Sequence, residues 1–462
     1  MTKPKFAQQR KVRDDIKMKK KLTQHSLFQS LEYVISTIPD ERSLNHTIHS
    51  IRDAIFVSFS GFFLQARSLK GHINFLKKTK ASRNKKSLFN ILTIPTDNHV
   101  RNILDPIPTT YFEKAQDDII FKMQRSGALK EFKKVLRHEG QTIEMGHLIG
   151  LDGFEYFRSK AIHCDHCCQV HHKDGTIDYF HRALLGGLIH PTQNLFLPIV
   201  QEFIIKQDGC EKEDCERKAA KRWLQKFREK HPHLPATILG DDAFCTQPYI
   251  CDLRHNRCGF ILSCQPGSHK TLFDWIAGLR QVGDLLVKEE KFREGKNWYI
   301  ATYEYANHVP LRDGEDAIYV NFVQVTICEK TTGKRVGIHS FATDFILTPE
   351  TCIEIAITGR RRWKSENEGN NTLTNNGYHL KHSFGHGKQN ESHNFVLLNL
   401  IAFMIHVILA YVGQEGYSSL QKAMDTLYEC FERIRTTFAL IACWSWEQLY
   451  EVALYGLDLD TS

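Results

Sequence analysis

Two short apolar segments of the chain each hold or precede an aspartate. His147–Phe157 (HLIGLDGFEYF) has Asp152 near its centre, and Pro235–Leu239 (PATIL) is followed, after one glycine, by Asp241 and Asp242. Apolar runs of this length predict buried strands. An ionised carboxylate in such a strand is costly unless it is paired or binds a metal ion. The two segments therefore predict an α/β fold whose core carries acidic side chains.

The chain on either side has a helical pattern. Residues 1 to about 140 are expected to be helical, with amphipathic stretches such as Ser26–Ile38 and Asp117–Leu136 separated by proline-containing loops. Towards the C-terminus we expect helices through Arg360–Asn367 and Phe395–Val412. The second of these is long enough to cross a bilayer, but it contains polar residues and lies between polar segments. A buried core helix is therefore the better interpretation.

The central part of the chain predicts further strands and one charged helix. The helix is Cys215–Glu229, and a bulge is expected where Gly186 and Gly187 interrupt a strand. From about residue 298 to residue 345, three segments of alternating character predict a β-rich region. The expected strands are Tyr179–Ile189, Leu195–Ile199, Gly259–Cys264, 298–306, 318–329 and 335–345.

Composition and charge narrow the class of protein. A length of 462 residues predicts two to four domains, and 42% hydrophobic with 25% charged residues is typical of a globular protein rather than a disordered or fibrous one. The net charge of +8 is concentrated in two basic clusters, which suit a phosphate backbone. For the first cluster, a solvated tail is an equal alternative. The clusters are Lys3, Lys5, Arg10, Lys11, Arg13, Lys17, Lys19, Lys20 and Lys21, and then Lys77, Lys78, Lys80, Arg83, Lys85 and Lys86.

The cysteines indicate a compartment and a candidate metal site. Thirteen cysteines without a secretory signal indicate a reducing, cytoplasmic location, with thiols or metal ligands rather than disulfides. Cys164 and Cys167 have zinc-like spacing, and a structural zinc site would need two further ligands. Free thiols in a hairpin are the alternative. The candidates for the further ligands are Cys210, Cys215, His163 and His171.

Three acids are candidate metal ligands: Asp152, Asp241 and Glu366, the last expected on a helix one turn after Arg362. Two strand aspartates and a helix glutamate form a hard-oxygen site of the kind that Mg²⁺ or Mn²⁺ prefers. Two such ions about 3.5–4 Å apart can activate an attacking oxygen and stabilise the leaving oxygen of a phosphodiester. Arg362 would reach the glutamate or a DNA phosphate. Taken singly, a buried acid is more often a capping or salt-bridged residue.

The segments around these acids resemble a known family. DGFEYF at 152–157, LGDDAF at 239–244 and the R-W-x-x-E of Arg362–Glu366 resemble the three signature segments of bacterial insertion-sequence DDE transposases, most closely the group named after insertion sequence four. Similar blocks extend the resemblance from about residue 50 to residue 455. These blocks are 94–104, 203–224, 264–272, 309–321 and 370–388.

The resemblance implies a ribonuclease-H-like catalytic core with a β-rich insertion before the glutamate helix. It makes Asp152, Asp241 and Glu366 the catalytic ligands of two Mg²⁺ or Mn²⁺ ions, with Asp241 preferred to Asp242 because of its position after the strand. From Asp152 to Asp241 is 89 positions and from Asp241 to Glu366 is 125, which leaves room for the insertion. The implied activity is cleavage and strand transfer at the terminal inverted repeats of an insertion sequence. The implied enzyme acts as a homodimer on double-stranded DNA in the bacterial cytoplasm, at the nucleoid.

The expected domains and DNA contacts follow from this resemblance. Residues 1–140 would be a helical, basic DNA-binding domain, and 141–280 the first part of the catalytic core, with a Cys-rich arm at 160–175. Residues 281–347 would be the β-rich insertion, 348–415 the rest of the core, and 416–462 a C-terminal helical segment. Trp363 could stack on a base, but packing in the core is the favoured expectation. The loops around residues 268–270 and 377–388 could equally be ordinary surface loops. The residues expected to contact DNA are Arg362, Lys270, His382, Lys388, Lys77 and Lys78.

One departure from the family pattern keeps an alternative open. The family's glutamate helix usually carries a tyrosine three positions before the arginine and a lysine seven positions after the glutamate. Here these positions hold Gly359 and Leu373, with Thr374 next. The alternative function is therefore a catalytically silenced or domesticated relative that binds DNA without cutting it. Glu368 is the alternative ligand if the register of the helix is shifted.

Overall fold

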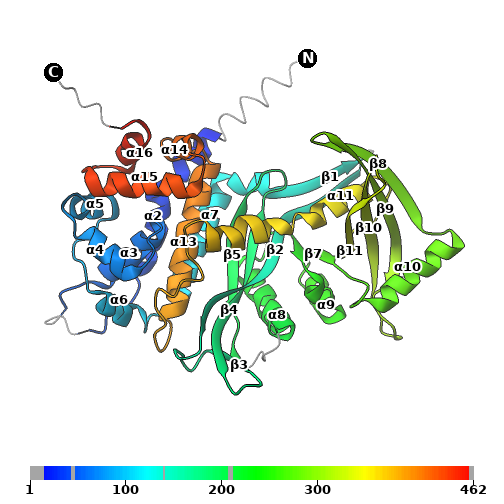
Figure 1. The fold of residues 1–462 in the computed structure, drawn as a ribbon, viewed down its shortest axis with the longest axis horizontal. Helices are drawn as coiled ribbons and strands as arrows, with labels where there is room; N and C mark the ends of the chain where they lie inside the picture. Colours follow the sequence, from blue (N-terminus) through cyan, green and yellow to red (C-terminus); the bar gives the residue numbers. More distant parts are fainter. Residues whose placement is uncertain (1–14, 43–46, 139–140, 207–211, 457–462) are drawn as a thin grey trace, which may run out of the picture. The chain divides into compact units, whose positions relative to one another are not determined.

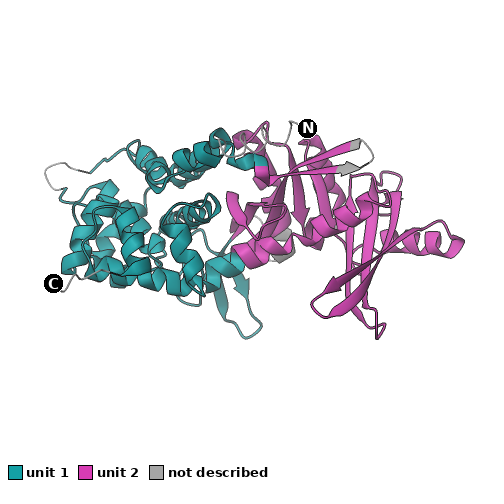
Figure 2. Cartoon of the chain, turned by 90° about the horizontal axis from the view of Figure 1, so that it is seen from above, with its two compact units in different colours: residues 1–130, 155–182, 370–462 teal, residues 131–154, 183–369 magenta. Residues whose placement is uncertain are grey.

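The fold is divided into two compact units, each assembled from distant parts of the chain. The computed structural model describes residues 15–42, 47–138, 141–206 and 212–456 (Figure 1). Unit 1 comprises residues 1–130, 155–182 and 370–462, and unit 2 comprises residues 131–154 and 183–369 (Figure 2). The chain as a whole is a mixed α/β structure, as the apolar segments predict.

Unit 1 is mostly helical, and its helices come from both ends of the chain. Many of them begin at a serine or threonine whose hydroxyl accepts a hydrogen bond from a backbone N–H of the first turn, as Ser50 does from Asp53. The earlier helices are α2 (Gln24–Ile35), α3 (Ile51–Phe63), α4 (Leu69–Leu76), α5 (Thr79–Phe89), α6 (Asp97–Leu104) and α7 (Thr110–Ser126). The later helices are α12 (Thr372–Asn375), α13 (Glu391–Tyr411), α14 (Tyr417–Ala423), α15 (Leu427–Leu440) and α16 (Trp446–Tyr455).

Helix α13 lies in the core of unit 1. It is the one helix of the described residues that is long and apolar enough to cross a membrane, but 83% of its apolar window is buried. Its His406 ring lies 4.3 Å from the Phe63 ring of α3, and Asn399 donates to the carbonyl of Tyr378 at 2.8 Å. The polar residues of this helix are therefore bound within the unit, and the expected buried core helix is confirmed.

Side-chain amides join the two ends of the chain. Asn84 of α5 donates to the carbonyls of Phe438 and Ile441 at 2.8 and 2.6 Å and accepts from the N–H of Cys443 at 2.7 Å. Since Asn84 is fully buried, these three bonds satisfy an amide that would otherwise be costly to bury. The N-terminal and C-terminal helices thus form one body.

Unit 2 is built on a large mixed sheet. Strands β2 (Gln141–Ser159) and β4 (Ile177–Ile189) are divided between the units, because their residues 155–159 and 177–182 belong to unit 1. Strand β3 (Cys168–His171), which pairs with β4, also belongs to unit 1. The strand order is β5-β4-β2-β6-β7-β11-β10-β9-β8, with β1 (Lys133–His138) on β2. The remaining strands are β5 (Phe196–Phe203), β6 (Ala236–Gly240), β7 (Gly259–Ser263), β8 (Leu286–Glu294), β9 (Asn297–Pro310), β10 (Tyr319–Glu329) and β11 (Arg335–Thr343).

The sheet changes character along this order. Strands β2, β6 and β7 are parallel neighbours; α8 (Lys212–Lys230) leads from β5 to β6, and α9 (Gln247–His255) leads from β6 to β7. Strands β8 to β11 form an antiparallel meander whose last strand pairs with β7. The register of β4 and β5 shifts between Gly186 and Gly187, which confirms the expected bulge.

Helical segments cover both faces of the sheet at the antiparallel strands β4 and β5. On one face, a Cβ atom at Gly186 would collide with the Trp223 indole of α8. On the other face, a Cβ at Gly369 would lie 2.8 Å from the Phe196 ring, so the chain around residue 369 packs on β5. The close packing on both faces requires glycine at these positions and fixes where the segment after α11 (Thr351–Arg360) can lie.

Several sequence predictions need correction. The helix expected at Asp117–Leu136 ends at Ser126, where Gly127 adopts a left-handed conformation, and β1 follows a short 3₁₀ turn. The sequence did not predict β8 or α10 (Lys270–Val282), because β8 is largely exposed and lacks an apolar alternation. The helix expected at Arg360–Asn367 is interrupted after Arg360, and residues Ser365–Asn371 form a π-helical turn.

Candidate active site and metal-binding cluster

Asp152 lies on β2, and Asp241 directly follows the neighbouring parallel strand β6. The register of β2 and β6 pairs His147 with Ala236 and Gly150 with Leu239. Two residues further along, this register sets Asp152 opposite Asp241, where strands are about 4.8 Å apart. Both residues are half-buried. The structure therefore brings the two predicted aspartates to the same edge of the parallel strands.

The π-helical turn carries Glu366 over the same face of β2. A Cβ at Gly150 would collide with the hydroxyl of Ser365, so Ser365 packs directly on this strand. Because side chains alternate along a strand, Gly150 and Asp152 face the same side. Glu366 follows Ser365 and is exposed. The segment with the predicted glutamate thus lies on the face of β2 that presents Asp152.

Asp152, Asp241 and Glu366 do not form a closed set of ligands among the described residues, and of the three only Asp241 lines the neighbouring cavity. In the described part of the chain, only Cys164, Cys167, His181 and His386 form a group with all ligand atoms within 4.8 Å of one another. Carboxylates that share two ions about 3.5–4 Å apart need not all meet at one point.

A cavity of about 580 Å³ adjoins Asp241. Arg362 and Trp363 line it beside residues of β7 and β11. Trp363 is 45% exposed, so its expected role as a packed core aromatic is wrong. Helix α11 ends at Arg360, three residues before it. The lining combines a carboxylate, arginines and an aromatic ring. Its other lining residues are Ser263, Cys264, Gln265, Pro266, Gln324, Arg335, Ile338, His339, Ser340, Phe341, Gly359 and Arg360.

Asp242 has a different role from Asp241. Its carboxylate accepts from the N–H of Gln265 at 2.8 Å and lies 3.1 Å from Nδ1 of His269. Burial alone would lower the pKa of His269, but hydrogen bonds with Asp242 and Cys245 outweigh burial and raise this pKa to about 10. Asp242 therefore fixes the loop before α10, whereas Asp241 accepts from the N–H of Ala243 at 3.1 Å and begins the short turn that follows β6.

A buried glutamate near the site has no counterpart in the sequence predictions. Glu216 of α8 is 4% exposed and lies against Gly153, the residue after Asp152. Gly153 faces the opposite side of β2 from Asp152, because side chains alternate. Glu216 thus belongs to the packing of α8 on the sheet, and its position in a charged helix gives no sequence signal that sets it apart.

The positions that depart from the family pattern are buried. A Cβ at Gly359 would lie 2.7 Å from the Phe341 ring, which leaves no space there for a tyrosine. Leu373 is fully buried, which does not suit a lysine. Glu368 is half-buried, and burial raises its pKa. Lys364 contacts the carbonyl of Gln193 and so anchors the glutamate segment to the loop between β4 and β5.

The other residues expected to contact DNA belong to both units. Lys270 is exposed at the start of α10 in unit 2, and Lys77 and Lys78 are exposed between α4 and α5 in unit 1. Of the first basic cluster, residues 1–14 lie outside the described residues, whereas Lys17, Lys19, Lys20 and Lys21 are exposed on a helical segment. Lys85 is buried and donates to the carbonyls of Ile91 and Leu92, so its inclusion in the second basic cluster is wrong.

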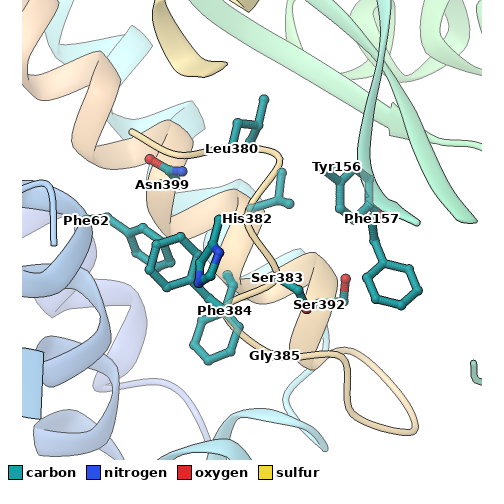
Figure 3. Close-up of a pocket in the computed structure, with 12 residues that line it drawn as sticks. Phe62, Tyr156, Phe157, Leu380, His382, Ser383, Phe384, Gly385, Ser392 and Asn399 are labelled. Atoms are coloured by element: carbon teal, nitrogen blue, oxygen red, sulfur yellow. The ribbon is translucent and has the colours of Figure 1, made fainter. Parts of the chain in front are cut away.

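The glycine- and histidine-rich loop between α12 and α13 carries His382 and Lys388, both exposed. Figure 3 shows His382 beside Phe384 and Phe62, and the rings of His382 and Phe384 meet edge to face at 5.0 Å. The end of the loop is fixed by Asp105, whose carboxylate accepts from the N–H groups of Lys388, Gln389 and Glu391. The loop is thus held against the helices of unit 1 while Lys388 remains available to solvent.

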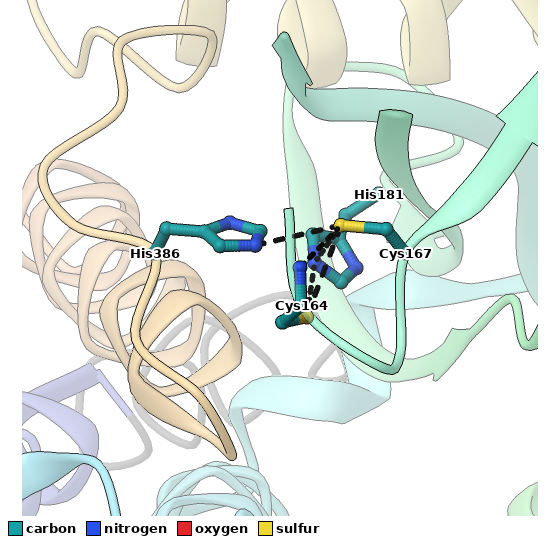
Figure 4. Close-up of side chains that lie close together, drawn as sticks. All are labelled: Cys164, Cys167, His181 and His386. Atoms are coloured by element: carbon teal, nitrogen blue, oxygen red, sulfur yellow. Dashed lines mark hydrogen bonds between the residues drawn. The ribbon is translucent and has the colours of Figure 1, made fainter. Parts of the chain in front are cut away.

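Four side chains of unit 1 converge on one point (Figure 4). Cys164 and Cys167 come from the arm before β3, with their Sγ atoms 3.8 Å apart. Nε2 of His181, on β4, lies 3.6 Å from Sγ of Cys164 and 3.4 Å from Sγ of Cys167, and Nε2 of His386 lies 3.4 Å from the latter. A hydrogen bond with Cys167 lowers the pKa of the Cys164 thiol well below its usual range.

The partners of the cysteine pair differ from those that the sequence suggested. Cys210 lies outside the described residues, and Cys215 lies in α8 at a position whose side chain is not described. His163 stacks on Tyr179 instead, with ring centroids 4.3 Å apart, and His171 is exposed. Sequence reasoning missed His181 and His386. His181 follows Cys167 by 14 positions, a spacing that zinc sites use, but His386 is more than 200 positions away and gives no local signal.

No protein-family model matches the chain, and no curated protein is detectably similar to it. The topology of unit 2, and the side chains that this topology brings together, are therefore the basis for a functional proposal.

Proposed function

We propose that the chain is a DDE-type DNA transposase with a ribonuclease-H-like core, and that Asp152, Asp241 and Glu366 are its catalytic metal ligands. One observation carries the proposal. Asp152 and Asp241 are set side by side on parallel strands, and the segment with Glu366 packs on the Asp152 face. The strand order β5-β4-β2-β6-β7, with helices between the parallel strands, supports the ribonuclease-H-like assignment. The meander β8–β11, inserted before α11, supports the family resemblance.

The chemistry follows from the ligand type. Three carboxylates suit two Mg²⁺ or Mn²⁺ ions, which would lower the pKa of a water and stabilise the charge on the leaving oxygen of a phosphodiester. The cavity beside Asp241 would give a DNA strand access to this carboxylate. Water attack would free a 3′-hydroxyl at the element's end, and this hydroxyl would then attack the opposite strand or target DNA. No step requires a covalent bond to the protein.

Arg362 is the residue best placed to position the DNA strand. It lines the same cavity as Asp241, and a guanidinium can bind a phosphate with two parallel hydrogen bonds. Trp363, exposed beside it, offers a face on which a base can stack. The exposed lysines of unit 1 would bind the rest of the inverted repeat, and a homodimer would hold two ends together.

A silenced relative that binds DNA without cutting it is the second candidate. The observation that favours it is the burial of positions 359 and 373, where the family's tyrosine and lysine would contact the DNA end. Binding would persist in this case because the exposed basic residues do not depend on the carboxylates. The two candidates make opposite predictions for metal-dependent cleavage.

The test is cleavage of a labelled DNA that carries the element's end, in Mg²⁺ or Mn²⁺. We expect nicking at the element boundary by the wild-type protein and its loss in Asp152→Asn and Glu366→Gln. Glu368→Gln is the matched control, since it lies on the same turn, and it should retain cleavage. Tight binding of the end without cleavage in either metal would contradict the enzyme and favour the silenced relative. Loss of cleavage in Glu368→Gln with retention in Glu366→Gln would move the third ligand to Glu368.

A further inference from the structure

The four ligand atoms in unit 1 have the spacing of a tetrahedral metal site. With metal–sulfur bonds of about 2.3 Å and metal–nitrogen bonds of about 2.0–2.1 Å, a regular tetrahedron places two sulfurs about 3.8 Å apart and sulfur and nitrogen about 3.6 Å apart. The observed distances are 3.8 Å between the two Sγ atoms and 3.4 to 3.6 Å from Sγ to Nε2. These are four of the six mutual distances, and all six are within 4.8 Å, a convergence that hydrogen bonds alone do not require.

We propose that Cys164, Cys167, His181 and His386 bind one Zn²⁺ ion. Two thiolates and two imidazoles suit zinc, whereas Mg²⁺ and Ca²⁺ prefer oxygen ligands. All four positions are taken by the protein, and both Cys167 and His181 are buried, with 0% and 1% exposure. A closed four-coordinate site has no position for water or substrate, so the zinc is structural.

The surroundings hold the ligands in place for a metal. The His386 ring stacks on Phe157 with centroids 4.1 Å apart, and the His181 ring stacks on Tyr156 at 5.7 Å. Nδ1 of His386 is buried and has no hydrogen-bond partner among the described residues. Stacking therefore fixes the plane of the His386 ring, and coordination through Nε2 would fix its direction.

The zinc joins two segments of unit 1 that are far apart in sequence. Three ligands lie within residues 164–181, and the fourth lies in the loop between α12 and α13. Asp105 already anchors the end of this loop at residues 388–391, so His386 adds a second anchor two residues earlier. The ion would set the conformation in which the loop presents Lys388. This role does not depend on the proposed transposase activity.

The principal alternative is a redox-active cysteine pair. Cys-x-x-Cys also forms disulfides, but the sulfurs lie 3.8 Å apart with two imidazole nitrogens beside them, an arrangement that a disulfide does not need. The two readings differ in metal content and in the oxidation state of the thiols. Both can be measured without DNA.

The experiment measures zinc per chain in the full-length protein by elemental analysis, followed by the absorption spectrum after replacement with Co²⁺. We expect one zinc per chain and the intense bands of tetrahedral Co²⁺ with a sulfur-to-metal charge-transfer band. Cys164→Ser and His386→Gln should each weaken zinc binding at least a hundredfold, more than the loss of an outer-sphere partner. Cys251→Ser, a cysteine exposed on α9 in unit 2, is the matched control and should keep the zinc.

Three results would overturn the proposal. They are a folded wild-type protein that takes up no zinc under reducing conditions, an octahedral Co²⁺ spectrum, and a Cys164–Cys167 disulfide in the metal-free protein with no gain in melting temperature on zinc addition. Because the wild-type spectrum is read directly, the test holds even if a variant fails to fold. Zinc content is also independent of cleavage, so failure of this proposal and failure of the proposed function are distinguishable.

Discussion

The two candidate metal sites of this chain differ in ligand type, closure and exposure. The candidate site in unit 2 has three carboxylates, of which Asp241 lines a cavity and Glu366 is exposed. The cluster in unit 1 has two thiols and two imidazoles packed within 4.8 Å of one another, mostly buried. Open oxygen sites leave positions for water and phosphate, whereas closed sulfur and nitrogen sites stabilise a fold. The number of coordination positions that the protein leaves free thus distinguishes the site proposed for chemistry from the site proposed for structure.

The largest expected effect separates the two sites by a single substitution. Asp241→Asn removes a charged ligand from the open site, so metal-dependent cleavage should fall on the order of 10³-fold. Zinc content and melting temperature should stay unchanged, because Asp241 is in unit 2 and the cluster is in unit 1. Single-turnover cleavage and elemental analysis of the same sample provide the test. Loss of zinc in this variant would break the separation between the two sites.

The second prediction concerns the packing that positions Glu366. Gly150→Ala puts a methyl group against the Ser365 hydroxyl, so the π-helical turn must shift. We expect a loss of about 1–3 kcal/mol in the free energy of unfolding and about a hundredfold loss of cleavage from the displaced ligand. Adding Ser365→Ala should restore part of both, since the closest contact is with Oγ.

Gly278→Ala is the matched control for this prediction. Gly278 lies in α10, with no atom within 4 Å of an added Cβ, so alanine should leave cleavage unchanged and slightly raise stability. Chemical denaturation and the cleavage rate measure both effects. Wild-type cleavage by Gly150→Ala would show that the turn over β2 does not hold a ligand.

The third prediction concerns the effect of acid on the stability of unit 1. Burial lowers the pKa of His72 to about 3, below the usual 6.5, so the folded state keeps this ring neutral. The stability that results is present above pH 6.5 and is lost as the pH falls, because the unfolded chain binds the proton first. Between pH 6.5 and 5 this costs about 2 kcal/mol. His72→Phe should remove this part of the acid sensitivity.

Denaturation of unit 1 at pH 7 and pH 5 checks this prediction. Ser60 retains the carbonyl of Val57 as a hydrogen-bond partner in the variant, so little else should change. Because acid also protonates zinc ligands, the variant separates the core histidine from the metal cluster. An unchanged difference between the two pH values would place the acid sensitivity of unit 1 elsewhere, with the zinc cluster as the first candidate.

The smallest expected effect concerns DNA binding. Lys77→Ala and Lys78→Ala each remove one exposed cation, so each should weaken binding of the element's end several-fold at all sequences and lower the salt slope by about 1. Lys422→Ala, at an exposed position of α14, is the control and should leave the affinity and the salt slope unchanged. Binding titrations over a range of salt concentrations give the slope. Equal effects at all three positions would indicate non-specific attraction rather than a binding face.

The two sites also differ in how far the sequence could predict them. Asp152 and Asp241 were accessible because a buried strand leaves a recognisable apolar run, and parallel pairing then sets the two residues together. Glu366 was found by its neighbouring residues, but the π-helical turn that carries it was not, because its cause is the packing of Ser365 and Gly369 on the sheet. Of the Cys/His cluster proposed to bind zinc, the sequence indicates only the local Cys-x-x-Cys pair. His181 and His386 join it through the fold, which no local pattern encodes.

Trp363 and Lys85 show the same limit for single residues. The composition around Trp363 suggests a core aromatic and that around Lys85 a basic surface, yet Trp363 is exposed and Lys85 is buried. The first depends on where α11 ends, and the second on two backbone carbonyls left unpaired after α5 that the ammonium group satisfies. Such details depend on tertiary structure rather than on residue type.

The most direct test of the central claim is anomalous diffraction from Mn²⁺ in a complex of the protein with its element-end DNA. The account predicts two ions about 3.5–4 Å apart, held by Asp152, Asp241 and Glu366 next to the scissile phosphate. Manganese bound elsewhere, or a scissile phosphate in place with no ion on these three carboxylates, would contradict it.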